Sequence, residues 1–496
     1  MMTIATVSAK EPIPVTVGPT DTPDQVIAKA TQVVPSARQL AWQRTEFAAF
    51  IHFGMNTFTD REWGEGPEDP KLFNPTDFDA HQWVQAIKAA GMRMLILTAK
   101  HHDGFCLWPT KYTEHCVRNS PWRNGKGDVV REVADACHEG GIRFGFYLSP
   151  WDRHEPTYGD SPRYNEHFMD QLRELLTRYG PIADVWFDGA CGEGPNGKRQ
   201  VYDFQGYWTL IRELAPEATI SIMGPDVRWC GNEAGHSRAS EWSVVPLPGA
   251  GDQPLWRSER GIRALTSFDC QQAEIGSRDQ LLAAAKAGAR LVWFPSQVDV
   301  SIRPGWFYHA QEDGQVKTLQ HLLDIYYGAV GGNSQLLLNI PPDRRGRLHE
   351  NDVQRLKEVG DILRLTFAHD LAHRAKAVAS SAAGDHTASK TVDGNPATYW
   401  SPEENEASPS LEYDLGSAKT FNVARLQEAI WVGQRVEEFA LDASVNGEWR
   451  EIARSTTIGY QRLLRFPEVT TSRVRLCLTK SRLCPTLSTF GLFCAP

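Results

Sequence analysis

Strand-like and helix-like segments alternate about eight times along the first three quarters of the chain, and this alternation limits the fold more than any other feature. Most of the strand-like segments are short continuous apolar runs, which are typical of parallel strands buried on both faces. We expect strands at residues 47–54, 92–98, 143–149, 183–190, 219–224, 239–245, 290–294 and 335–340. Segments with one apolar helical face lie between them, for example residues 79–90 and 164–179. The pattern predicts an α/β fold, best matched by a TIM-like (β/α)8 barrel.

A doubly wound open sheet is the runner-up for this region. That fold binds nucleotides through a glycine-rich loop after its first strand, and no such loop follows residues 47–54. The barrel therefore remains the preferred prediction.

The pattern changes near residue 370. From Val378 onward, short alternating segments are separated by turn residues and helical spacing is absent. This predicts an all-β sandwich of roughly 120 residues. We expect three parts: an extended N-terminal lead-in at residues 1–36, a catalytic barrel at 37–370 and the β-sandwich at 371–496.

Composition narrows the function classes. The formal net charge of −9 argues against a nucleic-acid-binding surface. No run of about 18 apolar residues occurs, so no membrane-spanning helix and no membrane partner is expected. The nine cysteines contain no Cys-x-x-Cys pair, so a zinc ribbon is not indicated. The 16 Trp, 13 Tyr and 21 Phe favour carbohydrate ligands, because aromatic rings stack on sugars, although a large core would use them too.

The N-terminus shows no basic region followed by an apolar run, so no secretory signal is visible. The compartment stays open, because a signal removed by processing would leave no trace. The oligomeric state also stays open.

Polar residues end or follow four of the predicted strands. In a barrel such residues gather at the C-terminal face, where the active site lies. They are His52, His101, His102, Asp103, Tyr147 and Asp188. One of them would be explained by packing or by a turn, but six together indicate a functional site.

Two kinds of site fit this set. Metal hydrolase barrels usually carry His-x-His after the first strand, but His52 lacks a second histidine, and the side chains of His101 and His102 would point apart in an extended strand. No metal ligand is therefore assigned. A sugar site would use neutral histidines and tyrosine as hydrogen-bonding groups. Candidate stacking residues are Trp63, Trp108, Trp186 and Trp306.

A sugar hydrolase also needs one ionised and one protonated carboxyl group. Asp188 is the ionised candidate. Glu233 lies near Trp229 in the loop after residues 219–224, where an apolar environment would raise its pKa as a general acid requires. The alternative is an ordinary solvated glutamate in a loop.

Five stretches, in order along the chain, resemble the α-L-fucosidases of glycoside hydrolase family 29. They are Phe50–Gly54, Lys100–Phe105, Val185–Gly189, Arg228–Gly235 and Val300–His309. The resemblance runs from about residue 36 to residue 365. The last two stretches resemble the subgroup that acts on α-1,3- and α-1,4-linked fucose.

The resemblance implies an exo-acting fucosidase that releases fucose from Lewis-type or 3-fucosylated oligosaccharides and glycoconjugates by a retaining mechanism. Asp188 matches the nucleophile and Glu233 the acid/base, with no cofactor for catalysis. The residues that match the fucose-binding pocket are His52, Glu62, Trp63, His101, His102, Tyr147, Trp186 and Trp306. A metal-dependent hydrolase and a non-catalytic fucose-binding lectin remain the alternatives, although a lectin would need no acid/base pair.

The C-terminal part resembles the discoidin or family-32 carbohydrate-binding modules, which have a galactose-binding-like jelly roll. The resemblance rests on Ala379–Ser381, Thr391–Trp400 and Leu411–Gly416. In such modules an Asp-Gly-Asn loop often wraps a structural Ca²⁺, and a glutamate near the last strand often completes the site. Here residues 490–496 contain no glutamate. Calcium binding, sugar binding and a purely shielding role for this module all stay open.

Overall fold

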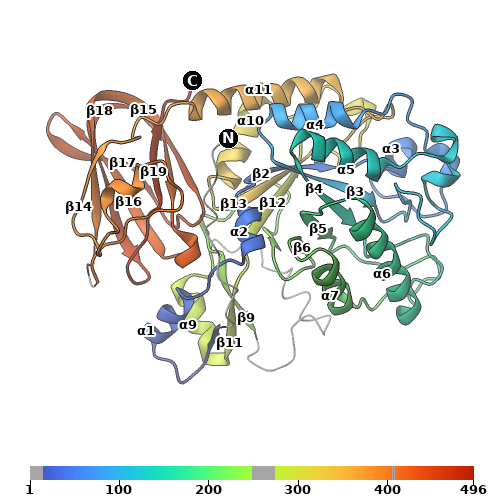
Figure 1. The fold of residues 1–496 in the computed structure, drawn as a ribbon, viewed down its shortest axis with the longest axis horizontal. Helices are drawn as coiled ribbons and strands as arrows, with labels where there is room; N and C mark the ends of the chain where they lie inside the picture. The colour runs from blue at the N-terminus through green and yellow to red at the C-terminus, as the bar shows by residue number, and fades with distance from the viewer. Residues whose placement is uncertain (1–14, 249–273, 405, 407) are drawn as a thin grey trace.

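Eight parallel strands form the sheet on which the larger part of the molecule is built (Figure 1). The computed structural model describes residues 15–248 and 274–496, apart from residues 405 and 407. The strands lie in the order β6-β5-β4-β3-β2-β13-β12-β7, and a parallel bridge between Ser221 and Val227 joins the two ends. The sheet is therefore a nearly closed barrel, as expected. Its strands are β2 (Phe47–Ile51), β3 (Met94–Lys100), β4 (Arg143–Leu148), β5 (Asp184–Phe187), β6 (Thr219–Ile222), β7 (Arg228–Trp229), β12 (Ser296–Ser301) and β13 (Ser334–Asn339).

Helices cover the outside of the barrel. Three of them begin at an aspartate whose side chain accepts a hydrogen bond from the first turn, Asp79 from Gln82 N, Asp128 from Arg131 N and Asp203 from Gly206 N. Their apolar faces pack on strands that are buried along their whole length, such as β3. The helices are α3 (Met55–Thr59), α4 (Ala80–Ala89), α5 (Val129–Gly140), α6 (Ser161–Arg178), α7 (Phe204–Leu214), α10 (Leu319–Ala329) and α11 (Glu350–Phe367).

Two of the eight predicted barrel strands are wrong. Residues 239–245 contain β8 (Ser240–Glu241), which pairs with β10 (Glu274–Ile275), and the start of β9 (Val244–Pro248). The prediction at 290–294 falls on β11 (Ala289–Trp293), which pairs antiparallel with β9 and with β1 (Val15–Val17).

Their places in the barrel are taken by β7 and β12. Strand β12 alternates polar and apolar residues. Gln297 and Asp299 face the barrel interior, whereas Val298 and Val300 face the helices. It therefore lacks the continuous apolar run used for the prediction. Strand β7 has only two residues, too few for any periodicity.

The predicted extended lead-in differs from the structure over residues 15–36. Strand β1 is followed by α1 (Pro23–Ala30), which begins with a capping box between Thr22 and Gln25, and then by α2 (Ala37–Gln43). Helix α1 packs with α9 (Arg278–Ala287) and β11 in a small apolar cluster. Residues 1–14 of the predicted lead-in lie outside the described residues.

The C-terminal part is an antiparallel β domain with its own apolar core, as expected. Alternating residues of its strands are buried, for example Leu411 and Tyr413, and Tyr413 stacks on Phe490 at 3.9 Å. Residues 410–427 and 462–481 each form one long strand, where short segments separated by turns were expected. The strands are β14 (Lys376–Ala379), β15 (Ser410–Gln427), β16 (Val436–Val445), β17 (Glu448–Ser455), β18 (Arg462–Ser481) and β19 (Thr489–Phe493).

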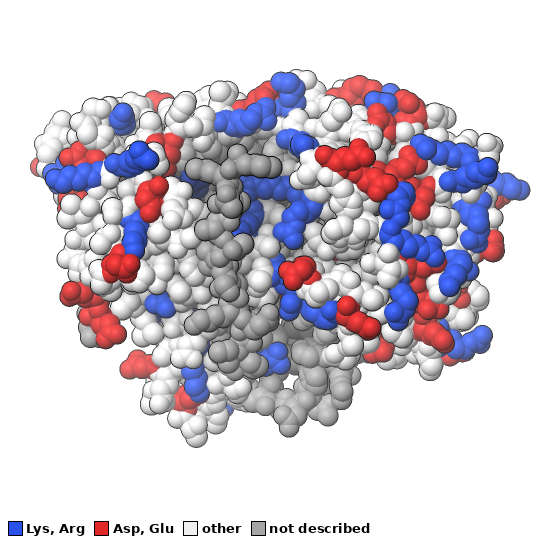
Figure 2. Space-filling model, viewed as in Figure 1, with Lys and Arg blue, Asp and Glu red and all other residues white. Residues whose placement is uncertain are grey.

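The β domain lies beside the barrel, and α11 leads from one to the other along the top of the view (Figure 1). Ion pairs and hydrogen bonds connect the two parts, including Arg278 with Glu437 and Tyr460 Oη with Glu46. On the face drawn in Figure 2, acidic and basic side chains are interspersed over the barrel. Within the described ranges, none of the helices is long and apolar enough to cross a membrane.

Candidate active site

A cavity of about 340 Å³ opens at the C-terminal ends of the barrel strands. All ten residues that the family resemblance assigns to the site line this cavity, whereas Asp103 and Trp108, which the sequence also offered, do not. The ten residues are His52, Glu62, Trp63, His101, His102, Tyr147, Trp186, Asp188, Glu233 and Trp306. The structure thus gathers side chains from seven separated parts of the chain into one pocket.

Asp188 directly follows β5 and both of its oxygens are held. The hydroxyl of Tyr147 donates to Oδ2 at 3.0 Å, and the backbone N–H of Ala190 donates to Oδ1 at 2.8 Å. The Nε2 atom of His102 lies 3.6 Å from Oδ2. Donors of this kind stabilise the ionised form of a carboxyl group and fix its direction.

Three buried histidines lie around Asp188. Burial lowers the pKa of His52 to about 4, lowers that of His101 well below its ordinary value, and lowers that of His102. Each ring has a hydrogen bond at Nδ1: His52 with Asn339 Oδ1 at 2.8 Å, His102 with Ser149 Oγ at 2.7 Å and His101 with Asn56 Nδ2 at 3.4 Å. The three imidazoles are therefore neutral near pH 7 and suited to hydrogen-bonding with uncharged hydroxyl groups.

The expectation that His101 and His102 point apart is wrong. Their ring centroids are 4.2 Å apart and both line the pocket. The chain leaves β3 at Lys100 and enters a turn, so the alternation of an extended strand does not apply at these two positions.

Aromatic side chains form much of the pocket wall. Trp186 stacks on Tyr147 with ring centroids 5.3 Å apart, and its Nε1 donates to Gln297 Oε1 at 2.7 Å. Trp63 is 54% exposed at the rim. Trp108, which the sequence offered as a stacking residue, is instead fully buried in the core and donates to Glu174.

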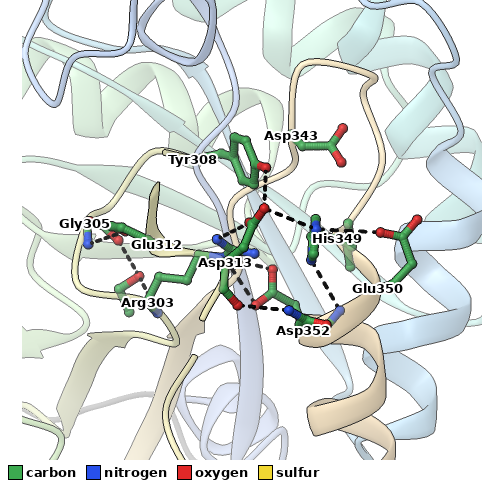
Figure 3. Close-up of polar contacts among 12 residues, drawn as sticks. Arg303, Gly305, Tyr308, Glu312, Asp313, Asp343, His349, Glu350 and Asp352 are labelled. Carbon is green, nitrogen blue, oxygen red and sulfur yellow. Dashed lines mark hydrogen bonds and ion pairs between the residues drawn. The ribbon is translucent and has the colours of Figure 1, made fainter. Parts of the chain in front are cut away.

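Glu62 fixes the loop that carries Trp306. Its carboxylate accepts hydrogen bonds from the backbone N–H groups of Trp306 at 2.8 Å and Phe307 at 3.1 Å, and it lies 2.8 Å from His309 Nε2. This loop is also anchored on its other side (Figure 3). There Arg303 pairs with Asp313 and with Asp352 of α11, at 2.9 Å each. Trp306 is thus held on a preorganised segment.

Glu233 lies in the loop after β7 and also lines the pocket. Its side chain reaches solvent at the mouth of the pocket. Burial of the carboxyl group raises its pKa, a hydrogen bond with Trp306 opposes this, and the negative charges of Asp188 and Glu62 raise it further. A glutamic acid with a raised pKa in the same pocket as a second carboxyl group fits the arrangement in which one group donates a proton and the other attacks.

The sequence reasoning missed Asp299, a fourth carboxyl group in the pocket besides Glu62, Asp188 and Glu233. It is 5% exposed, and its Oδ1 accepts from Trp229 Nε1 at 2.6 Å. Burial raises its pKa to about 7, and the charges of Glu233 and Asp188 contribute. The alternation Gln297-Val298-Asp299 could have identified it as an inward-facing residue of a half-polar strand.

Ile222, also in the pocket wall, has a strained backbone. Its φ of 69° lies in the left-handed region, which β-branched residues rarely adopt. The backbone N–H of Ile222 donates to Val227 O at 2.9 Å, so the strain occurs where the chain turns from β6 into β7. Such strain persists only where the surrounding structure holds it, and it is common at functional sites.

In the described part of the chain, no group of three or more His, Cys, Asp or Glu side chains is arranged to hold a metal ion. In the loop expected to wrap calcium, Asp393 already accepts hydrogen bonds from Asn395 N at 2.7 Å and Thr398 Oγ1 at 2.9 Å. Calcium binding by this loop stays a prediction.

The barrel and its aromatic pocket, which is lined by both Asp188 and Glu233, define the class of this protein as a glycoside hydrolase. A family model described as Alpha-L-fucosidase matches residues 58–366, and one described as F5/8 type C domain matches residues 376–487. The chain belongs to the α-L-fucosidase family, glycoside hydrolase family 29, and ends in an F5/8 type C, or discoidin, domain.

Relatives support this assignment over nearly the whole chain. Alpha-L-fucosidase 1 of Arabidopsis thaliana is 43% identical over 468 residues, covering 93% of this chain and 87% of that protein. A putative α-L-fucosidase from Bacteroides ovatus has a solved structure with a TM-score of 0.85 and 48% identity, covering 97% of this chain and 78% of that one. A Ruminococcus gnavus family 29 fucosidase in complex with fucose is 32% identical, with a TM-score of 0.82, covering 94% and 95%.

Proposed function

We propose that this α-L-fucosidase removes terminal α-1,3- and α-1,4-linked fucose from Lewis-type or 3-fucosylated glycans by a retaining double displacement. The observation that carries the mechanism is the pairing of Asp188, held by Tyr147 and Ala190, with Glu233 in the same pocket. A retaining glycosidase needs one ionised nucleophile and one protonated acid in such a pair.

In the first step, a carboxylate oxygen of Asp188 attacks the anomeric carbon of fucose while the bond to the leaving oxygen breaks. Glu233 gives its proton to that oxygen, so the glycan leaves as an alcohol. In the second step, the ionised Glu233 takes a proton from water, and the water oxygen displaces Asp188 from the anomeric carbon. Fucose leaves with its original configuration and both carboxyl groups return to their starting states.

The neutral histidines and Tyr147 would bind the fucose hydroxyl groups. Burial raises the pKa of Tyr147 well above its ordinary value, so its hydroxyl keeps its proton and donates to Asp188 throughout. Trp186 and Trp306 would form the wall against which the C5 methyl group of fucose packs. The fucose complex of the Ruminococcus gnavus relative supports a monosaccharide of this kind in the pocket.

The linkage preference rests on the resemblance of Arg228–Gly235 and Val300–His309 to the α-1,3/1,4 subgroup. Both stretches border the pocket, through Glu233 and Trp306. A branched acceptor that fills the space beyond fucose would use remote binding energy to orient the reacting bond. We therefore expect 3-fucosyllactose and Lewis trisaccharides to be cleaved much faster than 2′-fucosyllactose.

The experiment that tests the function is incubation with these three substrates while free fucose is measured. Proton NMR before mutarotation identifies the anomer that is released first. Release of α-L-fucose from an α-linked substrate supports retention, whereas β-L-fucose contradicts both carboxyl assignments. Faster cleavage of 2′-fucosyllactose contradicts the linkage preference, and no fucose from any substrate contradicts the hydrolase.

For the discoidin domain, sugar binding remains an alternative to a shielding role, and so does a structural Ca²⁺ at the Asp393–Asn395 loop. Thermal unfolding with added CaCl₂ and with a chelator tests calcium directly, because an ion that binds only the folded state raises the unfolding temperature.

A further inference from the structure

The two residues of β7 face opposite sides of the barrel wall. Trp229 faces the pocket and donates to Asp299. Arg228 faces outward and is fully buried. Its guanidinium group forms an ion pair with Glu241 and donates to the carbonyl oxygens of Trp242 at 3.1 Å and Phe294 at 3.0 Å. The strand that precedes the Glu233 loop is therefore clamped from both faces.

These side-chain contacts matter because β7 has little backbone pairing. Only two residue pairs join it to β12, and the single Ser221–Val227 bridge closes the barrel on its other side. By contrast, β3 pairs with β2 over four residues and with β4 over six. Glu233 follows β7 by four residues, so a shift of β7 would move the carboxyl group of Glu233 within the pocket.

Glu241 is itself held by the discoidin domain. Its backbone N–H donates to Thr457 Oγ1 at 3.2 Å, and its carbonyl oxygen accepts from Gln434 Nε2 at 3.2 Å. Gln434 also accepts from Ser243 N at 2.8 Å, and Arg462 donates to Thr457 Oγ1 at 2.9 Å. Gln434 and Thr457 are both fully buried between the two domains.

We propose that the discoidin domain positions the acid/base of the barrel. Gln434 and Thr457 hold Glu241, and Glu241 holds Arg228 of β7. Strand β7 then keeps the Glu233 loop in the orientation for proton transfer. The inference rests on the proposed role of Glu233. None of these four supporting residues lines the pocket, so all four are positioning residues. The domain thus has a role in the reaction that does not depend on whether it binds sugar.

A positioning role has a kinetic signature that a merely stabilising role lacks. A glycan leaving group needs a proton in the transition state, whereas an activated aryl leaving group needs almost none. A displaced Glu233 therefore slows the release of a glycan far more than the release of a nitrophenol. A partly unfolded enzyme loses both activities in equal proportion.

The test compares Gln434→Leu and Thr457→Val in the full chain with Tyr460→Phe as the matched control. Tyr460 also donates across the domain interface, to Glu46, but it touches neither Glu241 nor Arg228. For each variant, kcat is measured on 3-fucosyllactose and on 2-chloro-4-nitrophenyl α-L-fucoside, together with the unfolding temperature. We expect the ratio of glycan to aryl kcat to fall by roughly tenfold in the two test variants, since small displacements of a catalytic group cost up to about a hundredfold. Tyr460→Phe should keep the wild-type ratio.

Equal losses on both substrates, or the same change of ratio in Tyr460→Phe, would overturn the inference. Glu233→Ala separates it from the proposed function: an unchanged ratio in Glu233→Ala refutes the acid assignment itself. A reduced ratio in Glu233→Ala with unchanged ratios in both interface variants refutes only the positioning role.

A double variant, Glu233→Ala with Gln434→Leu, adds a further check. Once the acid is removed, the interface change should lower the ratio no further, because both act on the same proton transfer. An additional tenfold fall would contradict the proposal. If Gln434→Leu does not fold, Thr457→Val and Glu241→Gln carry the same comparison.

Discussion

The two sides of the pocket are built in different ways. On the side of Asp188, four neighbouring strands, β2 to β5, are paired along their lengths, and Lys100 beside His101 is buried in an ion pair with Asp152 at 2.8 Å. On the side of Glu233, a strand of two residues leads into an exposed loop, and Arg228 and Asp299 supply the support. Backbone pairing fixes the nucleophile side, and side-chain contacts fix the acid side. The two sides should therefore fail differently when they are altered.

The largest effect is expected at the nucleophile. Asp188→Gly should leave a folded protein whose activity on every fucoside falls by about four orders of magnitude or more, because the glycosyl-enzyme cannot form. Added azide should partly restore turnover of an aryl fucoside by taking the place of the carboxylate. The measurement is kcat on aryl and glycan substrates, with circular dichroism as the control for folding. Activity within tenfold of wild type would remove Asp188 from this role.

The acid side should show a selective loss instead. Glu233→Ala should reduce kcat on 3-fucosyllactose by about 10² to 10⁴, the usual contribution of a general acid, and reduce kcat on an activated aryl fucoside much less. The matched control is Glu65→Gln, an exposed glutamate outside the pocket that pairs with Arg61. Equal losses on both substrates would direct attention to Glu62 or Asp299 as the proton donor.

Glu62 tests whether the Trp306 loop belongs to the rigid part of the site. Glu62→Gln replaces one of the two acceptor oxygens with an NH₂ group, so the side chain can no longer accept hydrogen bonds from the backbone amides of Trp306 and Phe307 on separate oxygens. We expect KM to rise by about tenfold with a smaller change in kcat, because the sugar wall is loosened while the carboxyl pair stays intact. An unchanged KM would show that the contacts of Arg303 with Asp313 and Asp352 hold the loop without Glu62.

The smallest effect expected is on stability, and its sign differs between the two sides. Burial lowers the pKa of His52 from 6.5 to about 4, so its contribution to stability is lost as the pH falls from about 6.5 toward 4. Burial raises the pKa of Asp299 from 3.8 to about 7, so its contribution is present below about 3.8 and is lost as the pH rises through 7.

Asp299→Asn separates these opposing effects. Each titrating group changes the free energy of unfolding by at most about 1.4 kcal/mol per pH unit. Without the Asp299 carboxyl group, the unfolding temperature should decline less between pH 5 and pH 8 than it does in the wild type. The measurement is differential scanning calorimetry at several pH values. The same pH dependence in both proteins would show that Asp299 is not the group responsible.

The sequence predicted the nucleophile side well because that side follows simple periodic rules. Continuous apolar runs located β2 to β5, and polar residues at their ends located His52, Tyr147 and Asp188 in one pocket. The chain's turn after Lys100 was not visible in that pattern, so the orientation of His101 and His102 was predicted wrongly.

The acid side could not be predicted in this way. Strand β7 is too short to carry a period, and β12 faces the barrel interior with polar residues, such as Gln297, which donates to Gln335 of the neighbouring strand β13 at 2.7 Å. Apolar runs at 239–245 and 290–294 were more prominent, but they belong to strands outside the barrel. Glu233 was located by resemblance and by its neighbour Trp229 rather than by periodicity.

The long sequence separation of several contacts sets the order in which a newly made chain can complete this enzyme. Strands β2 to β5 and Asp188 lie in the first two fifths of the sequence, but His52 must wait for Asn339, which is 287 residues away. Glu241 must wait for Thr457, which lies 216 residues after it in the sequence. Contacts this distant make folding slow, and intermediates expose surface until the last element docks. During synthesis Asp188, the proposed nucleophile, therefore emerges well before the groups proposed to position Glu233, and those contacts are complete only when nearly the whole chain has emerged.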